Sequence, residues 1–204
     1  LIKHTDIDSE KWNRCIDNAL NCRIYAYDWH LDRTAVVWDA LVWADYEYVM
    51  PLPFRKKLGI KYLYQPIYSQ QLGIFPSPTP QVSKAFYVYL ISNFRYSDVH
   101  INSENISQKE PETLQFLPRK NYLLPLNQDY KSISSSFSKN TKRNISKASK
   151  QNLGLVEGIR LEEYLKFKKA NLQTTIGEKE LAKLKTLIAF GQRKGFGKIH
   201  GVYT

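Results

Sequence analysis

The sequence predicts a mixed α/β (α+β) protein, with a central mixed, mainly antiparallel sheet flanked by helices. Three observations support this fold class. The 204 residues are 43 % hydrophobic and 13 % aromatic, which is enough apolar material for a buried core. Segments with helical spacing of apolar residues occur towards both ends of the chain. Between them lie aromatic and β-branched segments separated by short turns, as in an antiparallel meander.

A helix is expected over residues 8–20, because Asp8 is a good N-cap residue and Glu10 lies in the first turn. The apolar residues that follow recur at helical spacing and form one face. They are Trp12, Cys15, Ile16, Ala19 and Leu20. A second, short helix is expected over residues 26–33.

Three strands are expected next, over residues 36–42, 46–54 and 62–74, because these segments are rich in aromatic and β-branched residues. A tight turn at 44–45 joins the first two strands. A basic turn joins the second strand to the third, and it contains Arg55, Lys56, Lys57 and Gly59. Sequential strands with short turns give a meander.

The proline-rich segment 76–80 ends the meander. Pro80 suits the first turn of a helix, which is expected to reach about residue 92. A short strand over 99–102 and a polar surface loop over 103–118 are expected to follow.

The second half of the chain is expected to begin the same pattern again. Helices are expected at 138–150, 161–172 and 178–190, with Gly191 as the stop of the last one. Strands are expected at 122–126, 155–159 and 198–203. This order predicts a first unit over residues 1–120 and an incomplete second unit over residues 121–204. The last strand has no expected hairpin partner, so a longer natural protein is expected to continue past Thr204.

The charge and the cysteine count restrict the function. Thirty basic residues against 19 acidic ones give a formal charge of +11, which favours nucleic acid, phosphorylated small molecules or an anionic membrane surface as partners. General solubility is the alternative. Two cysteines and four widely spaced histidines predict neither a disulfide scaffold nor a metal site. No apolar run approaches a membrane span and the start is not a signal peptide, so the expected compartment is the cytoplasm.

A basic helix at 138–150 is the most informative local feature. Its cations fall on one side of a helix wound at about 100° per residue, and no acid lies within 139–150. They are Lys139, Lys142, Arg143, Lys147 and Lys150. This stripe predicts a phosphate-binding surface, for tRNA or for a nucleotide-linked acceptor. Arg143 is the best single candidate, because its planar guanidinium binds phosphate in bidentate fashion. The alternative is an ordinary solvated face.

Four stretches of the chain carry a resemblance to a known family: Trp38-Asp39-Ala40-Leu41-Val42, Val49-Met50-Pro51-Leu52-Pro53, Tyr64 to Gly73, and Asn140 to Ala148. They resemble a Fem-related (FemAB-like) group of tandem acetyltransferase-like (GNAT-type) proteins. The resemblance implies GNAT-like units and transfer of an acyl or aminoacyl group onto an amine. It also implies that the donor is acyl-coenzyme A or aminoacyl-tRNA, without deciding between them. None of these stretches is a catalytic signature.

In GNAT folds the third meander strand borders the reaction cleft, so the resemblance implies a substrate-binding role for residues on or beside it. They are Tyr64, Gln65, Tyr68, Gln70 and Gln71. Alternating aromatic and amide side chains can hold a peptide or a sugar by stacking and hydrogen bonding. The alternative is an aromatic strand packed against helices. The nearest acids, Asp45 and Glu47, are not assigned as a general base, and the catalytic residues stay unknown.

Two segments are expected not to hold coenzyme A. Residues 192–197 fit the Q/R-x-x-G-x-G/A pattern, but a helix precedes them and a strand follows them, the reverse of the context that phosphate binding needs. They are therefore expected to be a helix stop and a turn. The loop after the third strand contains Pro76, Pro78 and Pro80, which have no N–H to offer a phosphate.

The sequence therefore favours an N-acyltransferase or aminoacyltransferase of GNAT or Fem type. The alternative is a catalytically inactive GNAT-like module that binds RNA or another phosphate-bearing ligand.

Overall fold

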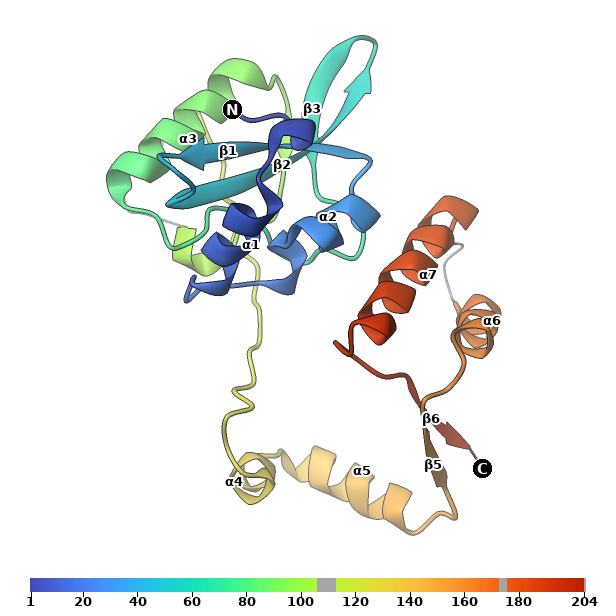
Figure 1. The fold of residues 1–204 in the computed structure, drawn as a ribbon. Coiled ribbons are helices and arrows are strands. Elements are labelled where there is room, and N and C mark those ends of the chain that lie inside the picture. The colour runs from blue at the N-terminus through green and yellow to red at the C-terminus, as the bar shows by residue number, and fades with distance from the viewer. Residues whose placement is uncertain (106–112, 173–175, 204) are drawn as a thin grey trace. The chain divides into compact units, whose positions relative to one another are not determined.

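The structure is a computed structural model that describes residues 1–105, 113–172 and 176–203. The chain divides into two compact units (Figure 1). The first comprises Leu1–Gln115 and Thr174–Phe190, and the second Phe116–Gln173 and Gly191–Thr204. Part of the loop expected over 103–118 lies outside the described residues.

The first unit is built on a four-stranded sheet with the order β1-β2-β3-β4. Its strands are β1 (Val37–Trp43), β2 (Tyr48–Lys57), β3 (Ile60–Tyr64) and β4 (Ser97–Asp98). The pairs β1–β2 and β2–β3 are antiparallel, whereas β3 and β4 are parallel. The protein is thus a mixed α/β fold with a mainly antiparallel sheet flanked by helices, as the sequence predicts.

Helices cover both faces of this sheet. They are α1 (Ser9–Asp17), α2 (Asp28–Thr34) and α3 (Pro80–Asn93), with 3-10 turns η1 (His4–Asp6), η2 (Ile24–Ala26) and η3 (Ser103–Asn105). Figure 1 shows α1 and α2 on one side of the sheet and α3 on the other. The main core lies under α1 and α2, where the fully buried Trp12 packs against Trp38 of β1 with 5.1 Å between ring centroids.

Capping explains where the first helices begin. The Asp8 carboxylate accepts hydrogen bonds from the backbone N–H groups of Glu10 and Lys11, and the Thr79 hydroxyl accepts one from Val82. Pro80 occupies the first turn of α3, where its missing N–H costs nothing. Helix α1 ends at Asp17, three residues earlier than its apolar pattern predicts, and Leu20 beyond its end is fully exposed.

The third predicted strand, 62–74, is wrong over most of its length. The strand β3 ends at Tyr64, and residues 65–75 form an irregular segment with single bridges at Leu72 and Phe75. Pro66 lacks a ladder donor, and Tyr68 and Gly73 have φ values of +66° and +117°. These three residues interrupt the strand pairing in a segment that mixes apolar residues with glutamines and a serine. The strand expected over 99–102 is also displaced, to β4 and a bridge at Ile101.

The second unit contains a two-stranded antiparallel sheet and helices with few buried residues. Its elements are α4 (Tyr130–Ser135), α5 (Lys139–Ser149), β5 (Gly154–Glu157), α6 (Leu161–Asn171) and β6 (His200–Tyr203). The strand expected over 122–126 is wrong, because these residues are exposed and pair with nothing in the described chain. The strand β6 does have a partner, since Gly154 to Glu157 of β5 pair with Tyr203 to His200.

Helix α7 (Glu178–Arg193) belongs with the first unit over residues 178–190. The Phe190 ring stacks on Trp29 of α2 with 5.0 Å between centroids, and the Arg33 guanidinium lies 3.8 Å from the centroid of the Phe190 ring. The Lys183 ammonium donates a 2.6 Å hydrogen bond to the Thr34 carbonyl. The sequence prediction placed this helix in the second unit because the order of elements shows nothing of these contacts.

Candidate phosphate-binding helix and substrate-binding segment

Helix α5 presents the predicted basic stripe. Ser138 caps the helix by accepting a 3.1 Å hydrogen bond from the Thr141 N–H, and every residue of the helix is exposed. The five cations fall within an arc of about 140° on a helical projection. They are Lys139, Lys142, Arg143, Lys147 and Lys150. The structure thus brings all five together on one solvent-facing side of one helix.

No described acidic residue neutralises this stripe. The side-chain contacts found for its cations go to neutral groups: Lys142 donates to the Ser135 carbonyl at 2.8 Å, and Arg143 donates to the Asn140 side chain at 2.8 Å. Among the described residues, the ion pairs lie elsewhere in the chain. The stripe is therefore a concentrated positive charge that an anion can approach without displacing a partner acid.

The predicted substrate-binding residues are mostly engaged within the first unit. The Tyr64 hydroxyl accepts a 2.8 Å hydrogen bond from the Val36 N–H, while the Arg55 guanidinium lies over its ring. The Gln65 amide donates to the Ser69 carbonyl at 2.7 Å and accepts from the His100 N–H at 2.9 Å. Tyr64 thus bonds to Val36 just before β1, and Gln65 ties the 65–72 segment to His100.

The other three predicted residues differ from one another in exposure and contacts. The Tyr68 hydroxyl donates a 3.2 Å hydrogen bond to the Glu180 carbonyl of α7. Gln71 accepts one of 3.2 Å from the Arg23 guanidinium, and Gln70 is exposed. Of the five, Gln70 presents the most accessible side chain. The substrate-binding role of this set stays a prediction.

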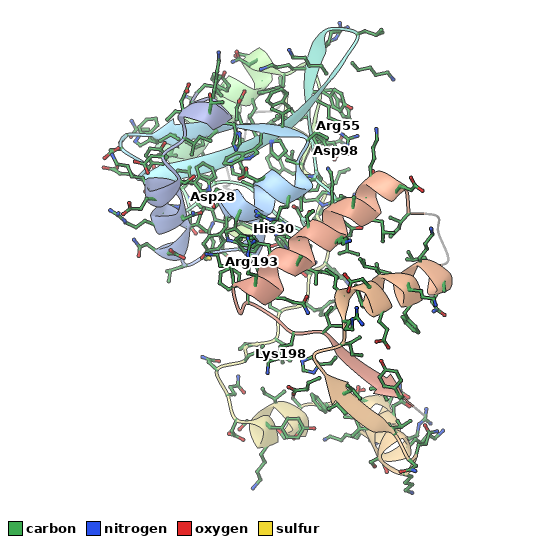
Figure 2. All side chains as sticks on the ribbon, turned by 45° about the vertical axis from the view of Figure 1, so that its right-hand side comes forward. Asp28, His30, Arg55, Asp98, Arg193 and Lys198 are labelled. Carbon is green, nitrogen blue, oxygen red and sulfur yellow. The ribbon has the colours of Figure 1, made fainter. Side chains whose placement is uncertain are left out.

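Sequence reasoning missed a buried polar cluster behind this segment. His30 of α2 is 3 % exposed, and its Nε2 lies 3.2 Å from both the Tyr68 carbonyl and the Ser69 hydroxyl (Figure 2 labels His30). The Ser69 hydroxyl is in turn 3.4 Å from that of Thr34. Because a carbonyl can only accept, Nε2 carries the proton and Nδ1 is a buried acceptor without a partner in the described structure.

Burial governs the titration of groups in this region. Desolvation lowers the pKa of His30 to about 4, with the nearby Arg33 charge acting in the same direction. Desolvation and the charge of Arg55 lower the pKa of Lys183. Burial also raises the pKa of Cys15 to about 11, so this thiol is not activated as a nucleophile. The polar cluster around His30 holds the 65–72 segment against α2, and the Tyr68 hydroxyl bonds it to α7.

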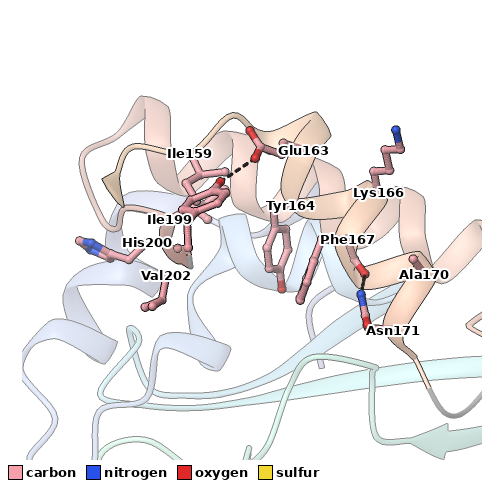
Figure 3. Close-up of a pocket in the computed structure, with 12 residues that line it drawn as sticks. Ile159, Glu163, Tyr164, Lys166, Phe167, Ala170, Asn171, Ile199, His200 and Val202 are labelled. Atoms are coloured by element: carbon pink, nitrogen blue, oxygen red, sulfur yellow. Dashed lines mark hydrogen bonds between the residues drawn. The ribbon is translucent and has the colours of Figure 1, made fainter. Parts of the chain in front are cut away.

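An apolar groove of about 680 Å³ lies in the second unit, between α6 and β6 (Figure 3). Tyr164 and Phe167 of α6 form one wall, and Ile199 and Val202 beside or on β6 contribute to the other. Glu163 and Tyr203 also line the groove, and the Tyr203 hydroxyl donates a 2.6 Å hydrogen bond to Glu163. In the sequence, the groove is indicated only by the spacing of Tyr164 and Phe167, three residues apart on one helix face.

The segment 192–197 forms a helix end, as the sequence predicts. The Phe196 N–H donates to the Gly191 carbonyl at 2.8 Å, and the Gly195 N–H donates to the Gln192 carbonyl at 3.1 Å. With Gly195 at φ +73°, this is a Schellman motif. The stop is Gly195 rather than the expected Gly191. These two N–H groups bond to the helix carbonyls and do not point at a phosphate.

The described residues contain no group of three or more His, Cys, Asp or Glu side chains placed to hold a metal ion. Nor does any described helix combine the length and the apolar character needed to cross a membrane.

Comparisons with protein-family models, curated proteins and solved structures found no match to this chain. The resemblance to Fem-related and GNAT-type proteins therefore stays a prediction from the sequence.

Proposed function

We propose that this chain is an N-acyltransferase or aminoacyltransferase module of GNAT or Fem type, and that α5 binds the phosphates of its substrate. The observation that carries the binding claim is the five-cation, acid-free face of α5. The transfer chemistry is supported by the resembling segments quoted above and by the mixed, mainly antiparallel sheet with helices on both faces. The chain's formal charge of +11 is in keeping with an anionic substrate.

The length of the stripe favours a polynucleotide over a single phosphate. Eleven helical residues extend about 16 Å, and phosphates on one strand of a duplex follow each other every 3.4 Å or so along the axis. Cations from Lys139 at the start to Lys150 at the end can therefore meet several successive phosphates. Aminoacyl-tRNA is the donor that fits this surface best.

The first test is the salt dependence of tRNA binding. Replacing Arg143 and Lys147 by Ala removes two cations from the stripe, so the log–log slope of affinity against salt should flatten by roughly one to two units. Stability should change little, because exposed cations contribute little to folding. Fluorescence anisotropy with labelled tRNA across a salt series measures this.

The matched control is Lys169→Ala with Lys185→Ala, which removes the same charge from exposed positions outside α5. It should leave the slope close to that of the parent. Equal slopes for all three proteins would show that α5 is only a solvated face.

The second test separates the enzyme from a binding module. An amine acceptor attacks the ester carbonyl of aminoacyl-tRNA, the amide bond forms, the ester C–O bond breaks, and the tRNA hydroxyl leaves with a proton. We expect radiolabel to move from aminoacyl-tRNA to a nucleotide-linked peptide that carries a free amine. Intact tRNA binding through α5 without any label transfer would favour the alternative, a catalytically inactive module that binds RNA.

A further inference from the structure

The hairpin between β2 and β3 carries an exposed apolar tip among cations. Figure 1 shows it extending past the helices that cover the sheet. Leu58 at the turn is 94 % exposed and Ile60 is 48 % exposed. Arg55, Lys56 and Lys57 precede the tip and are all exposed. No described residue packs over Leu58 sufficiently to bury it, so folding of this chain gains little from its side chain.

The turn itself is unfavourable for leucine. Leu58 has φ +50° and Gly59 has φ +79°. Positive φ at both central residues is the pattern of a type I′ turn, for which Asn-Gly is the favoured sequence. A bulky side chain in the left-handed region is strained. The hairpin therefore keeps a strained and exposed leucine where an asparagine would suit the turn better, which points to a role outside the fold.

The charges of the hairpin are also poorly balanced. Lys56 and Lys61 stand directly opposite each other in the β2–β3 register, and like charges in that position repel. Lys61 is partly compensated by Asp39, 3.7 Å away. Lys57 pairs with Ile60 in the same register, and the side chains of this pair lie on the other face of the ribbon. Cations therefore lie on both faces behind the apolar tip.

We propose that the β2–β3 hairpin docks on an anionic lipid surface, with Leu58 and Ile60 entering the interface while Lys56 and Lys57 contact headgroup phosphates. An apolar tip with cations behind it matches a bilayer, whose negative surface lies above an apolar interior. A phosphate backbone alone would leave the exposed leucine without an apolar surface to bury against, and the hairpin tip has no aromatic residue on which a base could stack. The surface is in the first unit and involves none of the residues of α5.

The test is flotation of the full chain with phosphatidylglycerol-containing vesicles, compared with pure phosphatidylcholine vesicles. The key variant is Leu58→Asn, which removes the apolar tip and suits the turn. We expect its affinity for anionic vesicles to fall about tenfold. Its unfolding midpoint should stay equal or rise, because asparagine tolerates positive φ. The loss of binding then cannot be assigned to misfolding.

Charge and position are controlled separately. Lys56→Gln with Lys57→Gln should weaken binding to anionic vesicles about thirtyfold, at roughly 1 kcal/mol for each lysine near the surface. Leu20→Asn, at another exposed leucine of the first unit, should bind like the parent. Parent-like vesicle binding by Leu58→Asn would overturn the proposal, because the tip would not be inserted. So would loss of tRNA affinity in Lys56→Gln/Lys57→Gln with no effect on vesicles, because the hairpin would then serve nucleic acid.

Discussion

Gly73→Ala should destabilise the first unit by about 3–4 kcal/mol. Gly73 has φ +117°, and a Cβ there would overlap Oδ1 of Asn105 and lie 3.3 Å from Nδ2 of Asn102. Asn105 is buried, being only 1 % exposed. Its side chain accepts a 2.5 Å hydrogen bond from the Ile74 N–H and donates one of 2.9 Å to the Ile74 carbonyl. A methyl group must displace this side chain and leave buried polar groups unpaired, in addition to the backbone strain.

Gly59→Ala is the matched control for the strain alone. Gly59 has φ +79°, and a Cβ there meets nothing within 4 Å, so its cost should be only about 1 kcal/mol. Chemical denaturation followed by tryptophan fluorescence measures both variants. All four tryptophans, at positions 12, 29, 38 and 43, lie in the first unit, so the signal reports that unit. Equal losses for the two variants would show that Asn105 moves aside freely.

Acidification should destabilise the first unit through His30. An unfolded histidine has a pKa of about 6.5, whereas burial lowers the folded pKa to about 4. Between these values the unfolded state binds more protons, so stability is lost as the pH falls through this window. The loss between pH 7 and pH 4.5 should be about 2 kcal/mol from this group. Protonation would create an N–H at Nδ1, a buried donor without an acceptor.

His30→Gln isolates this contribution, because glutamine keeps an N–H donor for the Tyr68 carbonyl but does not titrate. Denaturation curves of parent and variant at pH 7 and pH 4.5 give the comparison. The parent should lose about 2 kcal/mol more than the variant over this interval. A pH-dependent loss of the same size in both proteins would show that His30 is not the group responsible.

The two proposed surfaces can be tested independently because they lie in different units. The basic stripe of α5 belongs to the second unit, and the β2–β3 hairpin belongs to the first. Variants in α5 should change the salt dependence of tRNA binding without changing the effect of Leu58→Asn on vesicle binding. The sequence charge of +11 alone could not separate these two surfaces, since it counts all cations together.

Local patterns in the sequence were sufficient for most helices and for the first two strands. Asp8, Thr79 and Pro80 mark helix starts by chemistry that acts within one turn. The strands β1 and β2 are recognisable from their aromatic and β-branched residues and from the short turn between them. The five cations of α5 could also be placed on one side by helical geometry alone. These features depend on neighbours close in sequence.

Only the tertiary structure decided how distant segments share hydrogen bonds. The 65–74 segment lacks a continuous strand ladder, and Asn102 and Asn105 donate hydrogen bonds to its carbonyls at Leu72 and Ile74. The burial of His30 likewise depends on Tyr68 and Ser69, 38 and 39 residues away. Helix α7 joins the first unit through contacts that span more than 100 residues. Local periodicity carries no information on such partners, because it records which face of an element is apolar and not which segment will cover it.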